Sequence, residues 1–251
     1  MHFRPFLTRR AAPAILALVF ALSLLSSGCR TAPGDAGVTA PAPAAAPLPS
    51  GKGWWYARFR IAWPEGEEPD WSMGALIADR VVAPVLKTER GSIELWRFHR
   101  RAVRDQAGHA FSFIFYATPE SAQRIYQAIE CSPQLDALRA DQSVVWVGFD
   151  DTSSVARPAV KDVSDPAWPE IIQQSWPQYI MGASQMWLEL VQALAATEDK
   201  VHKDERAHYH AVQDQLDQLW ADEGRHVFLH HLNALFGYQP IQISEKTLMR
   251  F

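Results

Sequence analysis

Trp55-Tyr56-Ala57-Arg58-Phe59-Arg60-Ile61 is the stretch that decides the fold, because its side chains alternate in character. Every second residue from Trp55 onward is apolar, and the residues between are tyrosine or arginine. Successive side chains of a β-strand point to opposite faces of a sheet, so this alternation predicts a half-buried strand. One strand is not stable alone, and the flanking segments have to supply its partners.

A helix is expected directly after this strand. Asp70 is placed to cap its N-terminus, and apolar residues then recur at helical spacing, namely Met73, Leu76, Ile77, Val81 and Val85. Proline lacks the backbone N–H that an interior helical position donates, so Pro84 is expected to bend or end the last turns.

Two further strands are predicted at residues 93–100 and 109–117, separated by a polar turn that contains Arg104, Asp105 and Gly108. Apolar runs joined in this way are typical of a β-hairpin. Thr118-Pro119 marks the start of a second helix that should run to about Cys131, because proline is favoured at the first helical position. Residues 143–149 then supply a fourth strand.

The order strand, helix, strand, strand, helix, strand predicts an α+β fold with a ferredoxin-like βαββαβ unit over residues 51–150. A helical part follows over residues 151–251 and should pack on this sheet unit. Its long helices are expected at residues 170–197 and 203–236, with Gly237 as the stop. A short helix should begin at Ser244 and end at Phe251.

Near its start the chain carries the pattern of a bacterial lipoprotein signal. Three arginines precede an apolar run over residues 14–25, and Leu25-Ser26-Ser27-Gly28 leads into Cys29. The run is shorter than the ~20 apolar residues needed to cross a bilayer, so it is typical of a removable signal. The thiol of Cys29 is nucleophilic enough to accept a diacylglyceryl group. An ordinary secretory signal and an uncleaved membrane anchor are the alternatives.

We therefore predict an acylated lipoprotein, held in the bilayer through Cys29, on the periplasmic or extracytoplasmic side of the membrane, and at the outer membrane if the cell has two. Residues 1–28 are the signal peptide. Residues 29–50, rich in alanine and proline, form a tether that reaches on the order of 60 Å at ~3.1 Å per residue. Removing the signal takes away three arginines and no acidic residue, which changes the formal net charge from −4 to −7. Nucleic acid is not expected as a partner of so acidic a chain.

Two distant parts of the chain share motifs with one enzyme family. The first part opens with Trp54-Trp55-Tyr56 and continues with Phe98, Arg100, Asp105 and His109 around the hairpin. The second is His231-Leu232-Asn233-Ala234-Leu235-Phe236-Gly237, followed by Glu245. In these motifs the chain resembles, over roughly residues 53–250, the C-terminal elimination domain of lantibiotic dehydratases and its stand-alone relatives in thiopeptide biosynthesis.

The resemblance implies a scaffold for an extended peptide, with a candidate ligand pocket formed by Arg100, Asp105, His109, His231 and Asn233. In the family, the strand after the histidine alternates leucine with arginine, and those arginines are thought to serve glutamate elimination. Here the strand carries Phe111, Phe113 and Phe115, which cannot offer a carboxylate the charged fork of arginine. They indicate a hydrophobic sheet face instead. Export also separates the chain from charged tRNA, so glutamate elimination is not expected.

Acidic residues and histidines late in the chain have the spacing of metal ligands on one helical face. The two groups are Glu223, His226 and His230, and Glu198, His202 and Glu205. Neither helix repeats the Glu-x-x-His pairs of a di-iron bundle, so a solvated or hydrogen-bonded surface is expected, with no metal and no cofactor. Cys131 continues an apolar helical stripe, which predicts a buried thiol.

Six tryptophans cannot all be placed on the predicted core stripes: Trp54, Trp63, Trp71, Trp168, Trp176 and Trp187. Packing in the core and at its boundary is one interpretation, and an exposed edge that grips a peptide, glycan or envelope protein is the other. The expected function is a non-catalytic binding or assembly module with a peptide or envelope-protein partner. The alternative is a peptide-modifying enzyme that uses proton transfer between the hairpin and the last long helix.

Overall fold

The computed structural model describes residues 51–198 and 204–240. These residues belong to the second of two units of the chain, Ala46–Phe251. Cys29, the tether, His202 and the helix expected from Ser244 lie outside the described residues, so those predictions stay predictions. In the part of the chain that is described, no helix combines the length and the apolar character needed to span a bilayer.

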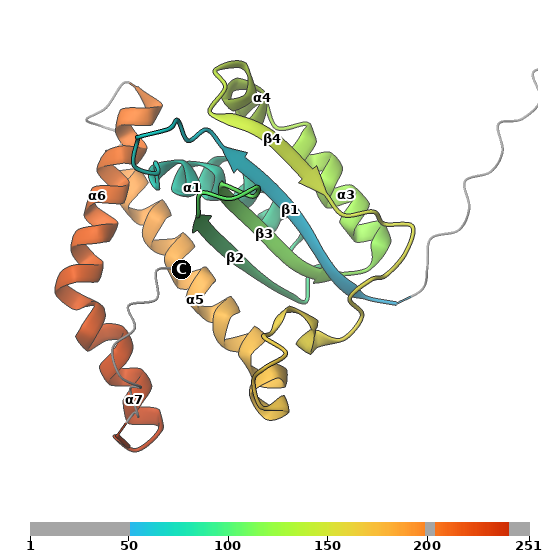
Figure 1. Ribbon diagram of the computed structural model, residues 1–251, viewed down its shortest axis with the longest axis vertical. Coiled ribbons are helices and arrows are strands. Elements are labelled where there is room, and N and C mark those ends of the chain that lie inside the picture. The colour runs from blue at the N-terminus through green and yellow to red at the C-terminus, as the bar shows by residue number, and fades with distance from the viewer. Residues whose placement is uncertain (1–50, 199–203, 241–251) are drawn as a thin grey trace, which may run out of the picture. The chain divides into compact units, whose positions relative to one another are not determined.

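Four strands form one antiparallel sheet in the order β2-β3-β1-β4 (Figure 1). They are β1 (Gly53–Ile61), β2 (Leu95–Ala102), β3 (His109–Ala117) and β4 (Val144–Phe149). Since β3 lies between β1 and β2, and β1 lies between β3 and β4, each helical connection crosses over one strand. This is the split βαβ arrangement of a ferredoxin-like α+β fold, which confirms the prediction from the order of elements.

The helices follow the predicted order with two additions, a second helix between β3 and β4 and a 3-10 turn after β4. The first crossover contains α1 (Ser72–Leu76), the π-helical segment η1 (Ile77–Val82) and α2 (Ala83–Glu89), and the second contains α3 (Pro119–Glu130) and α4 (Pro133–Ala140). After β4 come the 3-10 turn η2 (Val160–Val163), α5 (Glu170–Glu198), α6 (Glu205–Glu223), the π-helical segment η3 (Gly224–His230) and α7 (His231–Leu235). The two long C-terminal helices are therefore present, and Gly237 follows them with a φ of 70°.

Pro84 does not end the first helix, which continues to Glu89. The irregularity that the proline predicts takes the form of the π-helical segment immediately before α2. Because Pro84 has no N–H to donate, a widened turn at this point accommodates the missing backbone hydrogen bond.

α4 is a helix that the sequence prediction missed. Ser132 caps it by accepting a hydrogen bond from the backbone N–H of Leu135 at 3.4 Å, and Pro133 takes the first position. Thr118 and Pro119 mark α3 in the same way. Cys131 lies in the turn between the two helices and is exposed. The prediction of a buried thiol is wrong because the apolar stripe of α3 ends before the cysteine is reached.

The main core lies on one face of the sheet. β3 contributes Phe111, Phe113 and Phe115, all fully buried, and β1 contributes Phe59. The rings of Phe113 and Phe115 stack with centroids 5.0 Å apart. This confirms the hydrophobic face that the three phenylalanines predict.

Of the six tryptophans, Trp71 is exposed and the other five are buried or half-buried. Trp54 is buried, and its indole N–H donates to the carbonyl of Val160 at 2.9 Å, which holds η2 against the second face of the sheet. Trp187 packs against Phe98 with ring centroids 5.6 Å apart. Trp71 is 37% exposed. Trp146 is more exposed still, although the sequence did not single it out.

Replacing Phe113 with alanine should lower the free energy of unfolding by ~3–5 kcal/mol, because it leaves a cavity in a close-packed core. Urea denaturation followed by tryptophan fluorescence measures the change. Ile171→Ala, on an exposed position of α5, is the control and should stay within ~0.5 kcal/mol of the parent. Similar small effects for both substitutions would contradict the assignment of the core.

Candidate functional site

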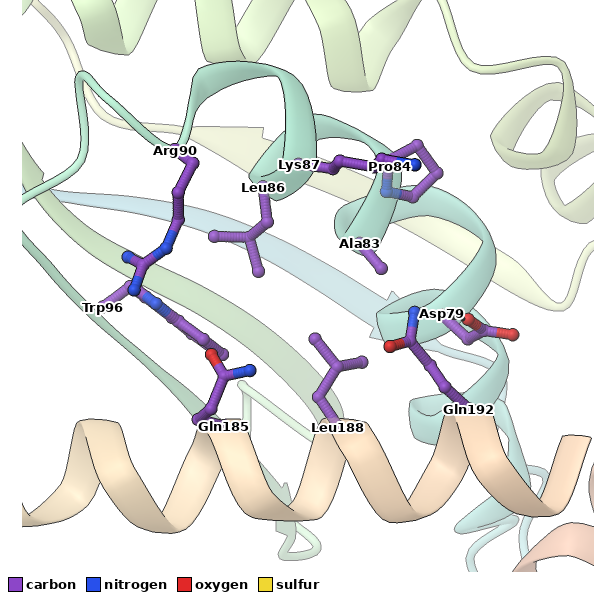
Figure 2. Close-up of a pocket in the computed structure, with 10 residues that line it drawn as sticks. All are labelled: Asp79, Ala83, Pro84, Leu86, Lys87, Arg90, Trp96, Gln185, Leu188 and Gln192. Carbon is purple, nitrogen blue, oxygen red and sulfur yellow. Dashed lines mark hydrogen bonds between the residues drawn. The ribbon is translucent and has the colours of Figure 1, made fainter.

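A groove of about 530 Å³ opens between the first crossover and α5 (Figure 2). Figure 2 shows Leu86 of α2 and Leu188 of α5 pointing into the space between the two helices, with Trp96 of β2 at one end. The lining consists of Asp79, Ala83, Pro84, Leu86, Lys87, Arg90, Trp96, Gln185, Leu188 and Gln192. Leu86, Trp96 and Leu188 are buried, so the floor is apolar, while charged and amide side chains form the rim.

The groove exists because α5 docks along the edge strand β2. The hydroxyl of Ser184 on α5 accepts a hydrogen bond from the backbone N–H of Phe98 at 3.1 Å. Trp187 packs on the same residue. These contacts hold α5 beside Trp96, the residue at the groove's end, and leave the space between α5 and α2 open.

The polar groups of the groove are mainly free donors. Lys87 and Arg90 are exposed and make no ion pair or hydrogen bond with another described residue. The indole Nε1 of Trp96 is buried and has no partner within the described chain. Figure 2 shows Arg90 extended toward the end of the groove where Trp96 lies. At this end of the groove, Arg90 therefore offers donors to a ligand.

The other end of the groove is occupied by a hydrogen-bonded acid. Asp79 accepts hydrogen bonds from the side-chain amide of Gln192, at 3.2 Å, and from the hydroxyl of Tyr209. Burial, together with the bond to Asp79, raises the pKa of Tyr209, so this phenol stays protonated and remains the donor. Asp79 thus connects η1 to both α5 and α6.

This arrangement suits a ligand that carries an acceptor or an anionic group next to an apolar part. Charged hydrogen bonds from Lys87 and Arg90 would favour a carboxylate over a neutral acceptor. The ten lining residues include no serine, threonine, cysteine or histidine.

Two residues of the sequence-predicted pocket, Arg100 and His109, do come close together. The guanidinium of Arg100 donates to the backbone carbonyl of Trp71 and, at 3.0 Å, to the side-chain oxygen of Gln213 on α6. Its Cζ lies 5.2 Å from the Trp71 ring centroid and 5.0 Å from that of Trp187. Burial lowers the pKa of Arg100 to about 10, so it is still charged at neutral pH.

His109 lies beside this cation and under the same indole. Its ring centroid is 5.2 Å from that of Trp71 and 6.2 Å from that of Trp63. The side chain is 2% exposed, and Nδ1 has no hydrogen-bond partner among the described residues. Burial, with the positive charge of Arg100 nearby, lowers the pKa of His109 to about 4, so the imidazole is neutral in the folded protein.

Asp105 holds the turn of the β2–β3 hairpin. It accepts two hydrogen bonds from Arg101, at 3.1 and 2.7 Å, and one each from the backbone N–H groups of Ala107 and Gly108. The bonds from Arg101 and Gly108 lower the pKa of Asp105 to about 2. Gly108 has a φ of 62°, a conformation that favours glycine.

The structure does not bring His231 and Asn233 to these residues. Both lie on α7, which continues the helical run beyond α6 and η3 (Figure 1). Arg100 reaches α6 at Gln213, and α7 begins 18 residues further along that run. At ~1.5 Å per residue this separates them by about 25 Å along the helix. The five-residue pocket therefore divides into a buried pair, a hairpin turn and a distant helix end.

The histidine groups gather without forming a metal centre. Among residues 51–198 and 204–240, no three histidine, cysteine, aspartate or glutamate side chains are arranged to hold a metal ion. The rings of His226, His230 and His231 instead pack on one another, with centroids 5.1 to 5.3 Å apart. Glu205 lies 3.5 Å from Arg80 in an ion pair. His202 lies outside the described residues, as does the side chain of Glu198.

Comparisons of the chain with protein-family models, with curated proteins and with solved structures gave no match. The site therefore has to be interpreted from its own geometry. The sequence did not single out Lys87, Arg90 or Trp96, and no local pattern marks them, because they come from two elements that α5 brings into one groove.

Acidification should destabilise the protein through His109. The pKa of His109 is about 4 in the folded protein and 6.5 in the unfolded chain. At pH values between these two, the unfolded chain therefore binds a proton that the native state does not bind. Stability is thus unaffected above pH 6.5 and falls as the pH drops toward 4, by ~2 kcal/mol between pH 7 and pH 5. Urea denaturation at both pH values should show this loss in the parent and a smaller loss in His109→Gln. Equal losses would contradict a buried neutral imidazole.

Proposed function

We propose that this protein is a non-catalytic binding module of the bacterial cell envelope. A lipid on Cys29 anchors it, residues 29–50 hold it away from the membrane, and the groove between α2 and α5 engages a segment of a peptide or protein partner. The partner segment carries a carboxylate next to an apolar side chain, since the groove combines an apolar floor with free cations.

The observation that carries the proposal is an apolar floor bordered by two exposed cations, Lys87 and Arg90, which pair with no other described residue. Lys87 and Arg90 gain no stabilisation from another described residue, so they are free to pair with a ligand carboxylate.

A second candidate is a peptide-modifying enzyme related to the elimination domains of lantibiotic dehydratases. Its support is the proximity of Arg100 and His109, two of the residues carried by that resemblance. Against it stand the burial of both side chains and the distance to His231 and Asn233. The binding function is favoured because the groove is open, whereas Trp71 covers the Arg100–His109 pair.

Cys29→Ser should abolish lipid labelling and release the protein from the membrane fraction, because that thiol is the proposed acylation site. Metabolic labelling with an alkyne-tagged palmitate, followed by fractionation, measures both effects. Cys131→Ser is the matched control, as it removes the chain's other cysteine and should leave labelling unchanged. Labelling that survives Cys29→Ser would refute the lipid anchor.

A photo-crosslinking amino acid at position 185, on the rim of the groove, should capture a partner in native membranes. The same group at position 171, on an exposed part of α5 outside the groove, is the positional control. Adding Lys87→Glu and Arg90→Glu should reduce the adduct from position 185 at least ~tenfold, since it replaces both cations by acids.

An adduct that is independent of Lys87 and Arg90, or equally strong from position 171, would contradict the proposed groove.

A further inference from the structure

The two edges of the sheet differ in how their backbone groups are satisfied. At the β2 edge, α5 lies alongside the strand, and the N–H of Phe98 donates to Ser184 (Figure 1). At the opposite edge, residues 145–149 of β4 make no hydrogen bond to another described residue beyond the ladder with β1. An edge with free N–H and C=O groups is a template for a further strand.

The side chains of β4 do not protect this edge. The strand reads Val-Val-Trp-Val-Gly-Phe, with neither a charge nor a proline, and Val145 and Trp146 are 55% and 53% exposed. Natural edge strands usually carry lysine, proline or a bulge against unwanted pairing. A register shift next to Val145 is such a feature, but residues 146–149 keep regular pairing with residues 57–60. A continuous, apolar part of the edge thus stays open.

A second groove, of about 510 Å³, lies next to this edge on the sheet face away from the phenylalanine core. Its lining includes Arg58 and Arg60 of β1 and Trp146 of β4, and it contains no acidic residue. In the sheet register Trp146 lies opposite Arg60, and Gly148 lies opposite Arg58. An anion at this position would meet two cations and an aromatic ring.

Gly148 is what allows Trp146 to occupy this place. A Cβ built on Gly148 would lie 1.9 Å from the six-membered ring of the Trp146 indole, a distance that no side chain can adopt. The indole therefore lies across the backbone of its own strand and forms one wall of the groove. The exposed ring therefore lies on the face of the sheet to which every second side chain of an added strand would point.

We propose that the β4 edge binds an extended, acidic segment of a protein partner as a fifth strand. Backbone hydrogen bonds to β4 supply the pairing, as in other cases of strand addition. An acidic side chain of the segment lies toward Arg60, and an apolar side chain two residues away lies against Trp146. The groove between α2 and α5 is on the other face of the sheet, so this inference stands or falls independently of the proposed function.

Charge favours an acidic partner over a second copy of this chain. Antiparallel pairing of two β4 edges would bring Arg58 and Arg60 of both copies to one face of a joined sheet, where like charges repel. The cations of the groove are incompletely neutralised: Arg58 pairs at 2.8 Å with Asp150, which Arg157 also contacts, and among the described residues Arg60 donates only to the backbone carbonyl of Gln106. An acidic strand supplies the missing counter-charge.

The test uses two fluorescein-labelled peptides that differ only in charge, Thr-Glu-Thr-Val-Thr-Glu and Thr-Lys-Thr-Val-Thr-Lys, in which charged and apolar side chains two residues apart share one face of the strand. Fluorescence anisotropy with the full-length protein in detergent, at low ionic strength, should show at least ~tenfold tighter binding of the glutamate peptide. Arg60→Glu should weaken that binding at least ~tenfold. Trp146→Ala, at an exposed position, should weaken it as well and guards against misfolding of the arginine variant.

Arg225→Glu is the matched control, because it reverses a charge at an exposed position of η3 that lines neither groove and should leave binding of the glutamate peptide unchanged. Hydrogen exchange should slow at residues 145–149 on peptide binding and stay unchanged at residues 95–102. Equal binding of both peptides, binding without protection of β4, or insensitivity to Arg60→Glu would overturn the proposal. Protection of β4 by self-association without peptide would assign the edge to a dimer instead.

Discussion

Three phenylalanines of β3, Phe111, Phe113 and Phe115, are packed without exposed surface between the sheet and its helices, and the other elements are arranged around them. Phe98 of β2 contacts Phe111 at 5.1 Å between centroids, and Tyr126 of α3 contacts Phe115 at 5.8 Å. Because strand side chains alternate with period two, burying this face of the sheet places Arg58 and Arg60 on the opposite one. The cationic groove beside β4 is therefore a consequence of where the phenylalanines are buried.

Buried polar contacts then connect this core to the C-terminal helices. Arg100 joins β2 to α1 through the carbonyl of Trp71 and to α6 through Gln213, while two indole rings flank its guanidinium. A Cβ on Gly74 of α1 would lie 3.0 Å from Nε of Arg100, so the absence of a side chain there makes room for it. A buried arginine is costly unless it is paired. Two hydrogen bonds use Nη2 of Arg100 and two indole rings face its charge, while Nε has no hydrogen-bond partner among the described residues. The same residue that suggests a ligand site in the sequence thus ties three elements together.

Local charge and net charge differ in this protein. The formal net charge is −4, and α6 exposes several acids, including Asp214, Asp217 and Asp222. Both grooves nevertheless present arginine or lysine next to a tryptophan. An acidic chain can therefore offer cationic binding surfaces, because the field close to a groove is set by the nearest side chains and that of distant charges is screened.

The four strands, their hairpin and the helix that begins at Thr118-Pro119 could be predicted from the sequence, because alternation, turn residues and caps are local signals. Ser132-Pro133 carries the same local signal for α4. Tertiary structure alone decided that Cys131 is exposed, that His231 lies far from Arg100, and that Lys87, Arg90 and Trp96 share one groove with α5. It also decided that β4 is an open edge while Ser184 covers β2. The physical reason is that these features depend on contacts between segments tens of residues apart, such as Phe98 with Ser184 and Arg100 with Gln213, which no local pattern of side chains records.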